Sequence, residues 1–256
     1  MNFTVNDLEI YLVIMVRITA FVFTAPLFSI RSIPQRAKVL FSLALALITY
    51  FSVPVEPLIY EGIIGYTVLV VKEAVCGLSL GFFSNICTYI LSFSGQFTDL
   101  QIGFSMMNEF DPVSGQSVTI SSNVFTYAVF IIMICTNMHL YILRAIIDSF
   151  TLVPVGLVNI NANIYELIGS FLINYMALGF RIVLPVFGSI LIANTLLAVL
   201  AKIAPQMNMF VIGYQLKIFI GLFVLSLMML MLPAICDKLF TEMMEMMRLG
   251  IRYFTP

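Results

Sequence analysis

Five ionisable side chains lie inside long apolar segments, where a chemical role or a paired charge must account for them. They are Arg17, Lys72, Glu73, Arg181 and Lys217. A charge at the centre of a bilayer costs at least about 2.5–3.5 kcal/mol even on lenient insertion scales, so none of them should face lipid acyl chains. Such groups can relay protons or ions across a membrane, or they can form structural ion pairs.

The five charges leave three interpretations open. A relay built on Lys72, Glu73 and Arg181 would make the chain a stand-alone, ion-coupled secondary transporter. Burial against sister subunits would let charges pair within an assembly, and in that case we expect Glu73 and Arg181 each to meet an opposite charge there. Internal pairs that only fix the helix register are the third interpretation. We find no internal sequence repeat, which argues against the inverted-repeat transporters.

No pattern in the sequence predicts catalysis, a cofactor or a metal. The chain has no GxSxG, Walker A or GxGxxG motif, and its single histidine, His139, lacks an HExxH context. We expect His139 to cap a helix end through a hydrogen bond. Cys76, Cys87, Cys135 and Cys236 show no CxxC spacing and are expected to be buried thiols.

A polar segment at 95–117 interrupts the apolar sequence and mixes amides and acids with Phe and Met. An ordinary solvated loop rarely exposes so many large apolar side chains. Irregular backbone at membrane depth is tolerated where protein buries it or where it lines a cavity. The segment is therefore either a plug that closes a channel or an amphipathic surface turn. The candidate plug residues are Gly103, Phe104, Met106, Met107, Asn108, Phe110, Asp111 and Pro112.

The elements that must position these residues are transmembrane helices. Of the 256 residues 61% are hydrophobic and 10% are charged, whereas a soluble domain is about a quarter charged. Several apolar runs exceed the roughly 20 residues that span a bilayer. The sequence predicts an all-α integral membrane protein with long, kinked helical hairpins and an irregular loop mid-chain. The runs lie at about 8–30, 37–54, 62–94, 118–138, 140–158, 164–200 and 210–236.

Loop charges indicate an orientation for the first hairpin. The connector 31–38 carries Arg31, Arg36 and Lys38 and no acid, whereas 54–62 carries Glu56 and Glu61. By the positive-inside rule, the first connector should be cytoplasmic and the N-terminus outside. The net charge of −1, without a larger basic cluster, excludes nucleic-acid binding as a function class.

Short motifs follow one another in order along nearly the whole chain. They are Arg17, Pro26-Leu27-Phe28, Pro34-Gln35-Arg36, Glu73, Gly77, Gly81, Gly95-Gln96, Asp99, Gly103-Phe104, Asp111-Pro112, His139, Ser149-Phe150, Pro154, Arg181, Pro185, the run from Ala204 to Phe210, Gly213 and Lys217. In these motifs the chain resembles the FliR family of the flagellar type III export gate. His139 ahead of Ser149-Phe150 favours this flagellar branch over the related SctT proteins of virulence secretion systems.

The resemblance implies a fold, partners and a location. It implies a structural and gating subunit that joins FliP and FliQ in a helical multi-subunit ring, with FlhB nearby. That ring would be the entrance pore for unfolded flagellar proteins, in the bacterial inner membrane at the flagellar basal body. It further implies that 1–160, including the plug loop, is FliP-like and that 161–256 is a FliQ-like helical hairpin. Within this loop, Gly103 to Gly115 matches the stretch that plugs the closed channel.

Overall fold

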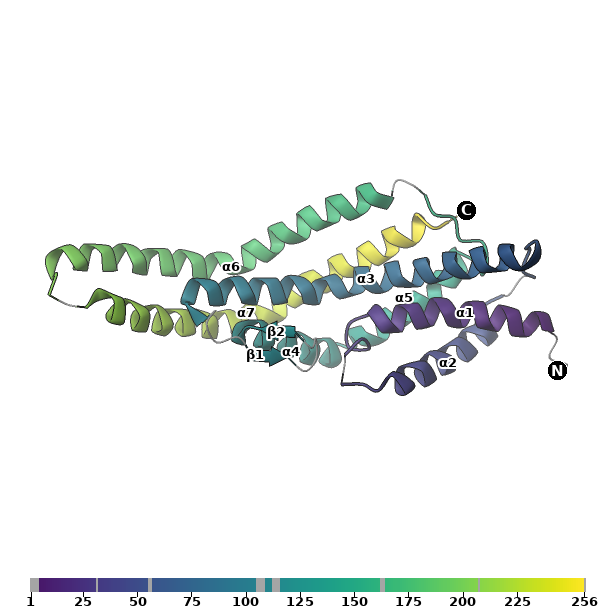
Figure 1. The fold of residues 1–256 in the computed structure, drawn as a ribbon, viewed down its shortest axis with the longest axis horizontal. Coiled ribbons are helices and arrows are strands. Elements are labelled where there is room, and N and C mark those ends of the chain that lie inside the picture. The colour runs from purple at the N-terminus through teal and green to yellow at the C-terminus, as the bar shows by residue number, and fades with distance from the viewer. Residues whose placement is uncertain are drawn as a thin grey trace. The chain divides into compact units, whose positions relative to one another are not determined.

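The apolar runs fold as helices in the computed structural model, which describes residues 5–30, 32–54, 57–104, 109–111, 116–161, 164–206 and 208–255 (Figure 1). Within these residues the predicted all-helical membrane class is confirmed. The structure also contains one short β-ribbon that the sequence did not predict. The helices are α1 (Val5–Thr24), α2 (Gln35–Ser52), α3 (Gly62–Ile102), α4 (Ile120–Cys135), α5 (Met138–Leu152), α6 (Ile164–Ile203) and α7 (Met209–Arg252). The strands are β1 (Glu109–Asp111) and β2 (Gln116–Val118).

Three of the described helices are long and apolar enough to cross a membrane. These are α3, α6 and nearly all of α7, with 41, 40 and 44 residues in the full helices. Pro185 lies inside α6 and Pro233 inside α7 without ending either helix. A fourth span is possible if α4 and α5, bent by 74° at a short break, are counted as one. The protein is therefore membrane-embedded.

The break between α4 and α5 has a local cause. Asn137 adopts a left-handed conformation with φ of 57°, which Asn tolerates better than most residues. The Nδ1 atom of His139 lies 3.4 Å from the carbonyl oxygen of Met133, near the end of α4. His139 thus holds the capping position that the sequence predicts.

The chain divides into two compact units that are not consecutive in sequence. Unit 1 comprises Met1–Cys87, Met133–Phe171 and Phe240–Pro256, and unit 2 comprises Thr88–Ile132 and Leu172–Leu239. Helices α3, α6 and α7 each contribute one part to unit 1 and another to unit 2. These limits differ from a boundary at residue 160, and the likeness of 1–160 to FliP and of 161–256 to FliQ stays a prediction.

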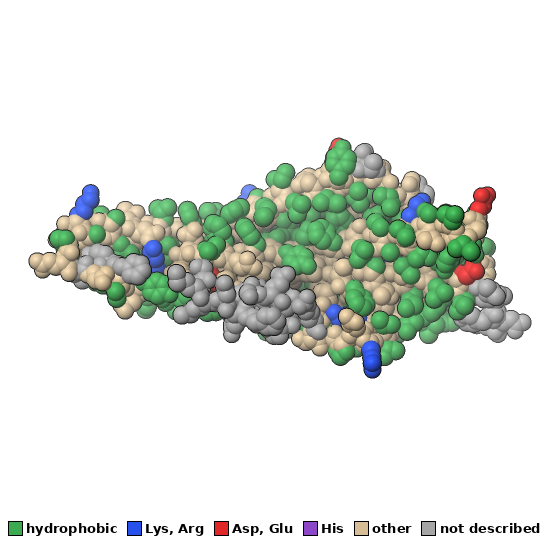
Figure 2. Space-filling view, in the orientation of Figure 1, with side chains coloured by type: hydrophobic (Ala, Val, Ile, Leu, Met, Phe, Trp, Pro, Cys, Tyr) green, Lys and Arg blue, Asp and Glu red, His purple; other side chains and the backbone are tan. Residues whose placement is uncertain are grey.

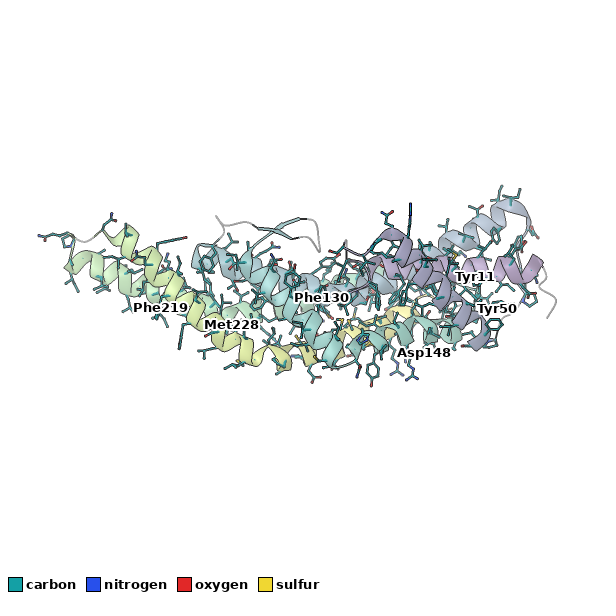
Figure 3. All side chains as sticks on the ribbon, turned by 90° about the horizontal axis from the view of Figure 1, so that it is seen from below. Tyr11, Tyr50, Phe130, Asp148, Phe219 and Met228 are labelled. Atoms are coloured by element: carbon teal, nitrogen blue, oxygen red, sulfur yellow. The ribbon has the colours of Figure 1, made fainter. Side chains whose placement is uncertain are left out.

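In unit 1, α1 and α2 form a hairpin that packs against α3. The Tyr11 hydroxyl donates to the carbonyl oxygen of Leu43 at 3.1 Å, and the Tyr11 and Tyr50 rings meet edge to face (Figure 3). Gly77 and Gly81 bring α3 onto α1. A Cβ on Gly77 would lie 2.2 Å from the carbonyl oxygen of Arg17, so only glycine permits this approach, as in other small-xxx-small helix contacts.

The end of α7 completes unit 1. Gly250 lies against the ring of Phe83, where an added Cβ would be 2.6 Å from the ring. Just beyond the helix, the backbone N–H of Asn159 donates to the carbonyl oxygen of Phe254 at 3.1 Å. The N–H of Asn161 donates to the carbonyl oxygen of Tyr253 at 3.2 Å. Segments almost 100 positions apart in the sequence are joined by these bonds.

Unit 2 packs the second part of α3 against α4, α6 and α7. The Ser94 hydroxyl donates to the carbonyl oxygen of Gly179 on α6 at 3.1 Å. The ring of Phe180, next along α6, meets those of Phe93 and Phe97 edge to face, both at 5.6 Å between centroids. Phe97, which lies in the segment predicted to be a loop, is therefore part of a helical interface.

Large apolar side chains remain exposed along the parts of α6 and α7 that belong to unit 2. Ile173 on α6 is 72% exposed and Phe219 on α7 is 73% exposed. Figure 2 shows apolar side chains over much of the visible face, with charged ones at scattered points. Soluble monomers rarely expose so large an apolar surface. Lipid or neighbouring protein must cover it.

Candidate functional site

A buried ion pair lies at the centre of unit 1. Arg17 of α1 and Glu73 of α3 are both fully buried, and Nε of Arg17 is 2.5 Å from Oε2 of Glu73. An ionised pair is stable in such a place only when the geometry is good and further hydrogen bonds satisfy the remaining donors and acceptors. The opposite charge that we expected for Glu73 thus comes from this chain.

Other groups of unit 1 extend the network, although Nη2 of Arg17 has no hydrogen-bond partner among the described residues. Nη1 of Arg17 donates to the carbonyl oxygen of Val153 at 3.0 Å and to the Ser149 hydroxyl at 3.3 Å. The guanidinium carbon lies 4.1 Å from the ring centroid of Phe150, a cation–π distance. Oε1 of Glu73 accepts the backbone N–H of Gly156 at 2.8 Å. The network joins α1, α3 and the end of α5, and its burial is typical of a structural group.

The remaining three predicted interior charges are placed differently. Lys72 and Lys217 are half-buried and Arg181 is exposed. None of the three forms an ion pair within the described residues. A partner charge for Arg181 would have to come from outside the described residues.

The sequence places Lys38 in the first connector, and this prediction is wrong. Lys38 lies in α2, is only 7% exposed and has its Nζ 5.7 Å from the ring centroid of Phe23. Burial lowers the pKa of its ammonium group. Its charge therefore contributes less to the orientation argument than its position in the sequence suggested.

The thiols also differ in part from prediction. Cys76, Cys87 and Cys236 are buried, as expected, whereas Cys135 is exposed at the end of α4. No group of three or more metal-ligating side chains lies together in the part of the chain that the structure describes.

A second site lies in unit 2, at the base of the predicted plug loop. The carboxylate of Asp99, fully buried near the end of α3, accepts two hydrogen bonds from Ser121 at the start of α4. The backbone N–H of Ser121 is 2.7 Å from Oδ2, and its hydroxyl is 2.5 Å from Oδ1. Asp99 thus caps α4 from another helix, and its negative charge suits the positive end of the α4 dipole.

Close packing supports this junction. A Cβ on Gly95 would lie 2.4 Å from the Cα of Ser122, so the α3 and α4 backbones touch here. The hydroxyls of Ser92 and Ser122 are 2.7 Å apart. The two ends of the loop are therefore held together by Asp99, Gly95 and Ser92, all on α3.

The loop itself is shorter than the predicted 95–117. Residues 95–102 continue α3, where the Asp99 carboxylate accepts hydrogen bonds from Ser121 of α4 and the ring of Phe97 packs against that of Phe180 on α6. Gly103, with φ of 100°, ends the helix beside the ring of Tyr214 on α7. Beyond it β1 pairs antiparallel with β2, so this part of the loop is not irregular.

The structure describes only some of the candidate plug residues. Gly103 and Phe104 are half-buried, and Phe110 and Asp111 belong to β1, where Phe110 pairs with Ser117. The other four candidates lie outside the described residues, namely Met106, Met107, Asn108 and Pro112.

Two contributors to this site were missed in the sequence. Ser121 stands beside Ser122 at the start of an apolar run, which is a common signal for a helix N-terminus and could have been noticed. Tyr214 carried no such signal, because one tyrosine in an apolar helix is unremarkable before its neighbours are known.

Comparison with known proteins gives consistent matches over almost the entire chain. The family of bacterial export proteins, family 1, matches residues 8–243. The flagellar biosynthetic protein FliR of Bacillus subtilis is 30% identical over 253 residues, covering 97% of this chain and 96% of that protein. FliR of Escherichia coli is 26% identical, with 94% and 92% covered. FliR of Aquifex aeolicus is also 26% identical, with 93% and 92% covered.

Proposed function

The chain belongs to the family of bacterial export proteins, family 1, and from this membership we propose that it is a subunit of the flagellar type III protein export apparatus. The observation that carries the proposal is the match to flagellar FliR proteins over more than nine-tenths of both chains. It works as a transport component and not as an enzyme. The virulence SctT branch is less favoured, because these relatives are flagellar.

We further propose its setting. The subunit lies in the bacterial inner membrane at the flagellar basal body and joins FliP-like and FliQ-like subunits, with an FlhB-like subunit nearby. The exposed charge of Arg181 supports a multi-subunit location, since it should not face lipid acyl chains. The exposed apolar surface of α6 and α7 needs either a neighbour or lipid. Unfolded flagellar proteins would pass through the channel that these subunits form.

The gate is the segment from Gly103 to Gly115. The two hydrogen bonds that Ser121 donates to Asp99 hold α3 and α4 together at its base, so movement of the segment would not separate the two helices. Gly103 supplies a backbone position at which the chain leaves the helix. A substrate can displace the gate only if closed and open states differ by a few kcal/mol, the range that ligands shift.

Co-expression tests the assignment to an assembly. The tagged chain, produced with FliP-like and FliQ-like neighbours, should co-purify with both in mild detergent as one complex. Produced alone, it should aggregate, because its apolar and charged surfaces lack their partners. A stable, monodisperse monomer that does not bind these neighbours would contradict the proposal and favour a stand-alone transporter.

Replacing part of the loop tests the gate. One variant lacks residues 104–110, and a second carries a Gly/Ser sequence of equal length there, which keeps the span between Asp99 and Ser121. Both should assemble, and both should admit a small dye into cells that the parent excludes. Equal dye entry at equal complex level would show that other parts hold the seal, and the loop would then be a surface turn.

A further inference from the structure

A groove of about 610 Å³ opens in unit 1 between α5 and the C-terminal part of α7. Tyr141, Arg144, Asp148 and Leu152 line it from α5, at spacings that place them along one side of the helix. From Tyr141 to Leu152 the helix rises about 16 Å, which is three turns. Asp148 is labelled on α5 in Figure 3. The groove is long enough for a short helix.

Four charged side chains line the groove. Arg144 and Asp148 of α5 and Glu245 and Arg248 of α7 are all exposed. None of the four forms an ion pair within the described residues, although Arg144 and Asp148 stand one turn apart, where helix residues can pair. Two cations and two anions of the groove are thus available to opposite charges of another molecule.

The groove lies at the polar end of α7. From Asp237 to Arg252 this helix carries six charged residues, in contrast to the apolar run 210–236 before them. Such a stretch does not belong in a hydrocarbon core, so acyl chains do not cover the groove. A phosphate bound by Arg144 and Arg248 would also meet Asp148 and Glu245, whose like charge repels it. An anionic lipid or a free anion is therefore a poor occupant.

The composition of the groove matches protein interfaces. Tyr, Met and Arg are enriched in interfaces, and Tyr141, Met244, Met247, Arg144 and Arg248 supply all three types here. Tyr141 is 54% exposed and Leu152 50% exposed. These two side chains lie on either side of the charged residues of α5 and offer apolar surface to a bound molecule.

We propose that this groove is a docking site for an amphipathic helix of a neighbouring export subunit, at least three turns long. One face of that helix is apolar, and its edges carry acidic residues for Arg144 and Arg248 and basic residues for Asp148 and Glu245. The inference rests on the proposed function, because it needs a partner subunit. It adds the surface of this chain and the chemistry of the segment that binds there.

A photocrosslinking experiment identifies the occupant. A photoreactive phenylalanine analogue replaces Tyr141, which preserves an aromatic ring, in the complex purified with FliP-like and FliQ-like neighbours. The same analogue at Phe219, exposed on the apolar part of α7, is the control. The Tyr141 position should give one defined adduct, mapped by mass spectrometry to a helical neighbour segment with both acids and bases, and Phe219 should not label that segment.

A charge reversal tests the contribution of the charges. Arg248→Asp and Arg252→Asp make the same change four residues apart on α7; both side chains are exposed, but only Arg248 lines the groove. Arg248→Asp should recover about tenfold less neighbour, since it places like charges opposite each other across the interface. Arg252→Asp should recover nearly the parental amount.

The outcomes separate this inference from the proposed function. If neighbours co-purify but Tyr141 labels only lipid, or a second copy of this chain, the docking site is wrong and the export function stands. Equal losses for Arg248→Asp and Arg252→Asp would also overturn the docking site. If the unmodified chain recovers no neighbour, both proposals fail.

Discussion

Replacing Glu73 by glutamine should destabilise unit 1 strongly, although the two side chains have nearly the same shape. The two carboxylate oxygens accept from different donors, Oε2 from Arg17 and Oε1 from the N–H of Gly156. Glutamine offers one acceptor oxygen and one donor nitrogen. Whichever way its amide is turned, one of the two contacts becomes donor against donor.

The expected loss is large on the scale of protein stability. Removing one partner of a buried ion pair costs about 3–5 kcal/mol, because the other charge stays buried without compensation. Arg17 cannot escape to water, since it is fully buried and held by Val153 and Ser149. Against a total stability of about 5–15 kcal/mol for a folded domain, the change should lower the yield of assembled complex severely.

The assay compares the complex yield and the detergent aggregation temperature of three variants at equal expression. Glu73→Gln is the test. Glu61→Gln, an exposed acid just before the same helix, removes the same charge and should behave as the parent. The double variant Arg17→Met with Glu73→Leu should recover part of the lost stability, because a buried pair can often be replaced by apolar residues of similar volume, while the Val153 carbonyl and the Gly156 N–H lose their bonds to the pair.

One pattern would refute this reasoning. If Glu73→Gln assembles with parental yield and aggregation temperature, the buried pair does not hold unit 1 together. If the same variant also stops export, Glu73 would act in proton transfer, and the relay interpretation would replace the structural one.

Two further substitutions test the helix contacts of the two units. Gly77→Ala should cost about 1–3 kcal/mol or more of folding stability through overpacking, because the added Cβ would meet the Arg17 carbonyl. Gly169→Ala, where an added Cβ has nothing within 4 Å, should be neutral or slightly stabilising. Equal aggregation temperatures for the two variants would contradict the close approach of α3 to α1. Asp99→Ala should cost about 0.5–2 kcal/mol of folding stability as a lost helix cap and should raise dye entry at equal complex level. Asp99→Asn should give a dye entry between those of the parent and Asp99→Ala, since its side chain keeps one acceptor oxygen. Unchanged dye entry would show that the junction with Ser121 does not control the gate.

Hydropathy predicted the helices but not all of their ends. The apolar runs located all seven helices of the described part of the chain, because lipid-exposed backbone must satisfy its hydrogen bonds internally and apolar segments of this length fold as helices. The end of α3 was missed because Phe97 and Asp99 lie in a polar segment that a hydropathy profile assigns to a loop. Their partners, Phe180 and Ser121, are fixed only by the tertiary fold.

Pairing between distant residues was the least predictable part of the site. Arg17 and Glu73 were both recognised as interior charges, but 56 positions separate them, and nothing local indicates that they meet. The contact depends on Gly77 drawing α3 onto α1, which is a backbone effect. In the same way, Lys38 follows Arg36 at the start of a helix, and only the packing of α2 against Phe23 shows that it is buried.

The interleaved order of the two units affects how the chain is made. A ribosome releases α1, α2 and the first half of α3 early, yet unit 1 closes only after Tyr253 and Phe254 have been synthesised and bonded to Asn161 and Asn159. Until then Gly250 cannot pack against the ring of Phe83. A translation product that stops before this point therefore lacks the backbone bonds and the helix contact that close unit 1 in the folded chain.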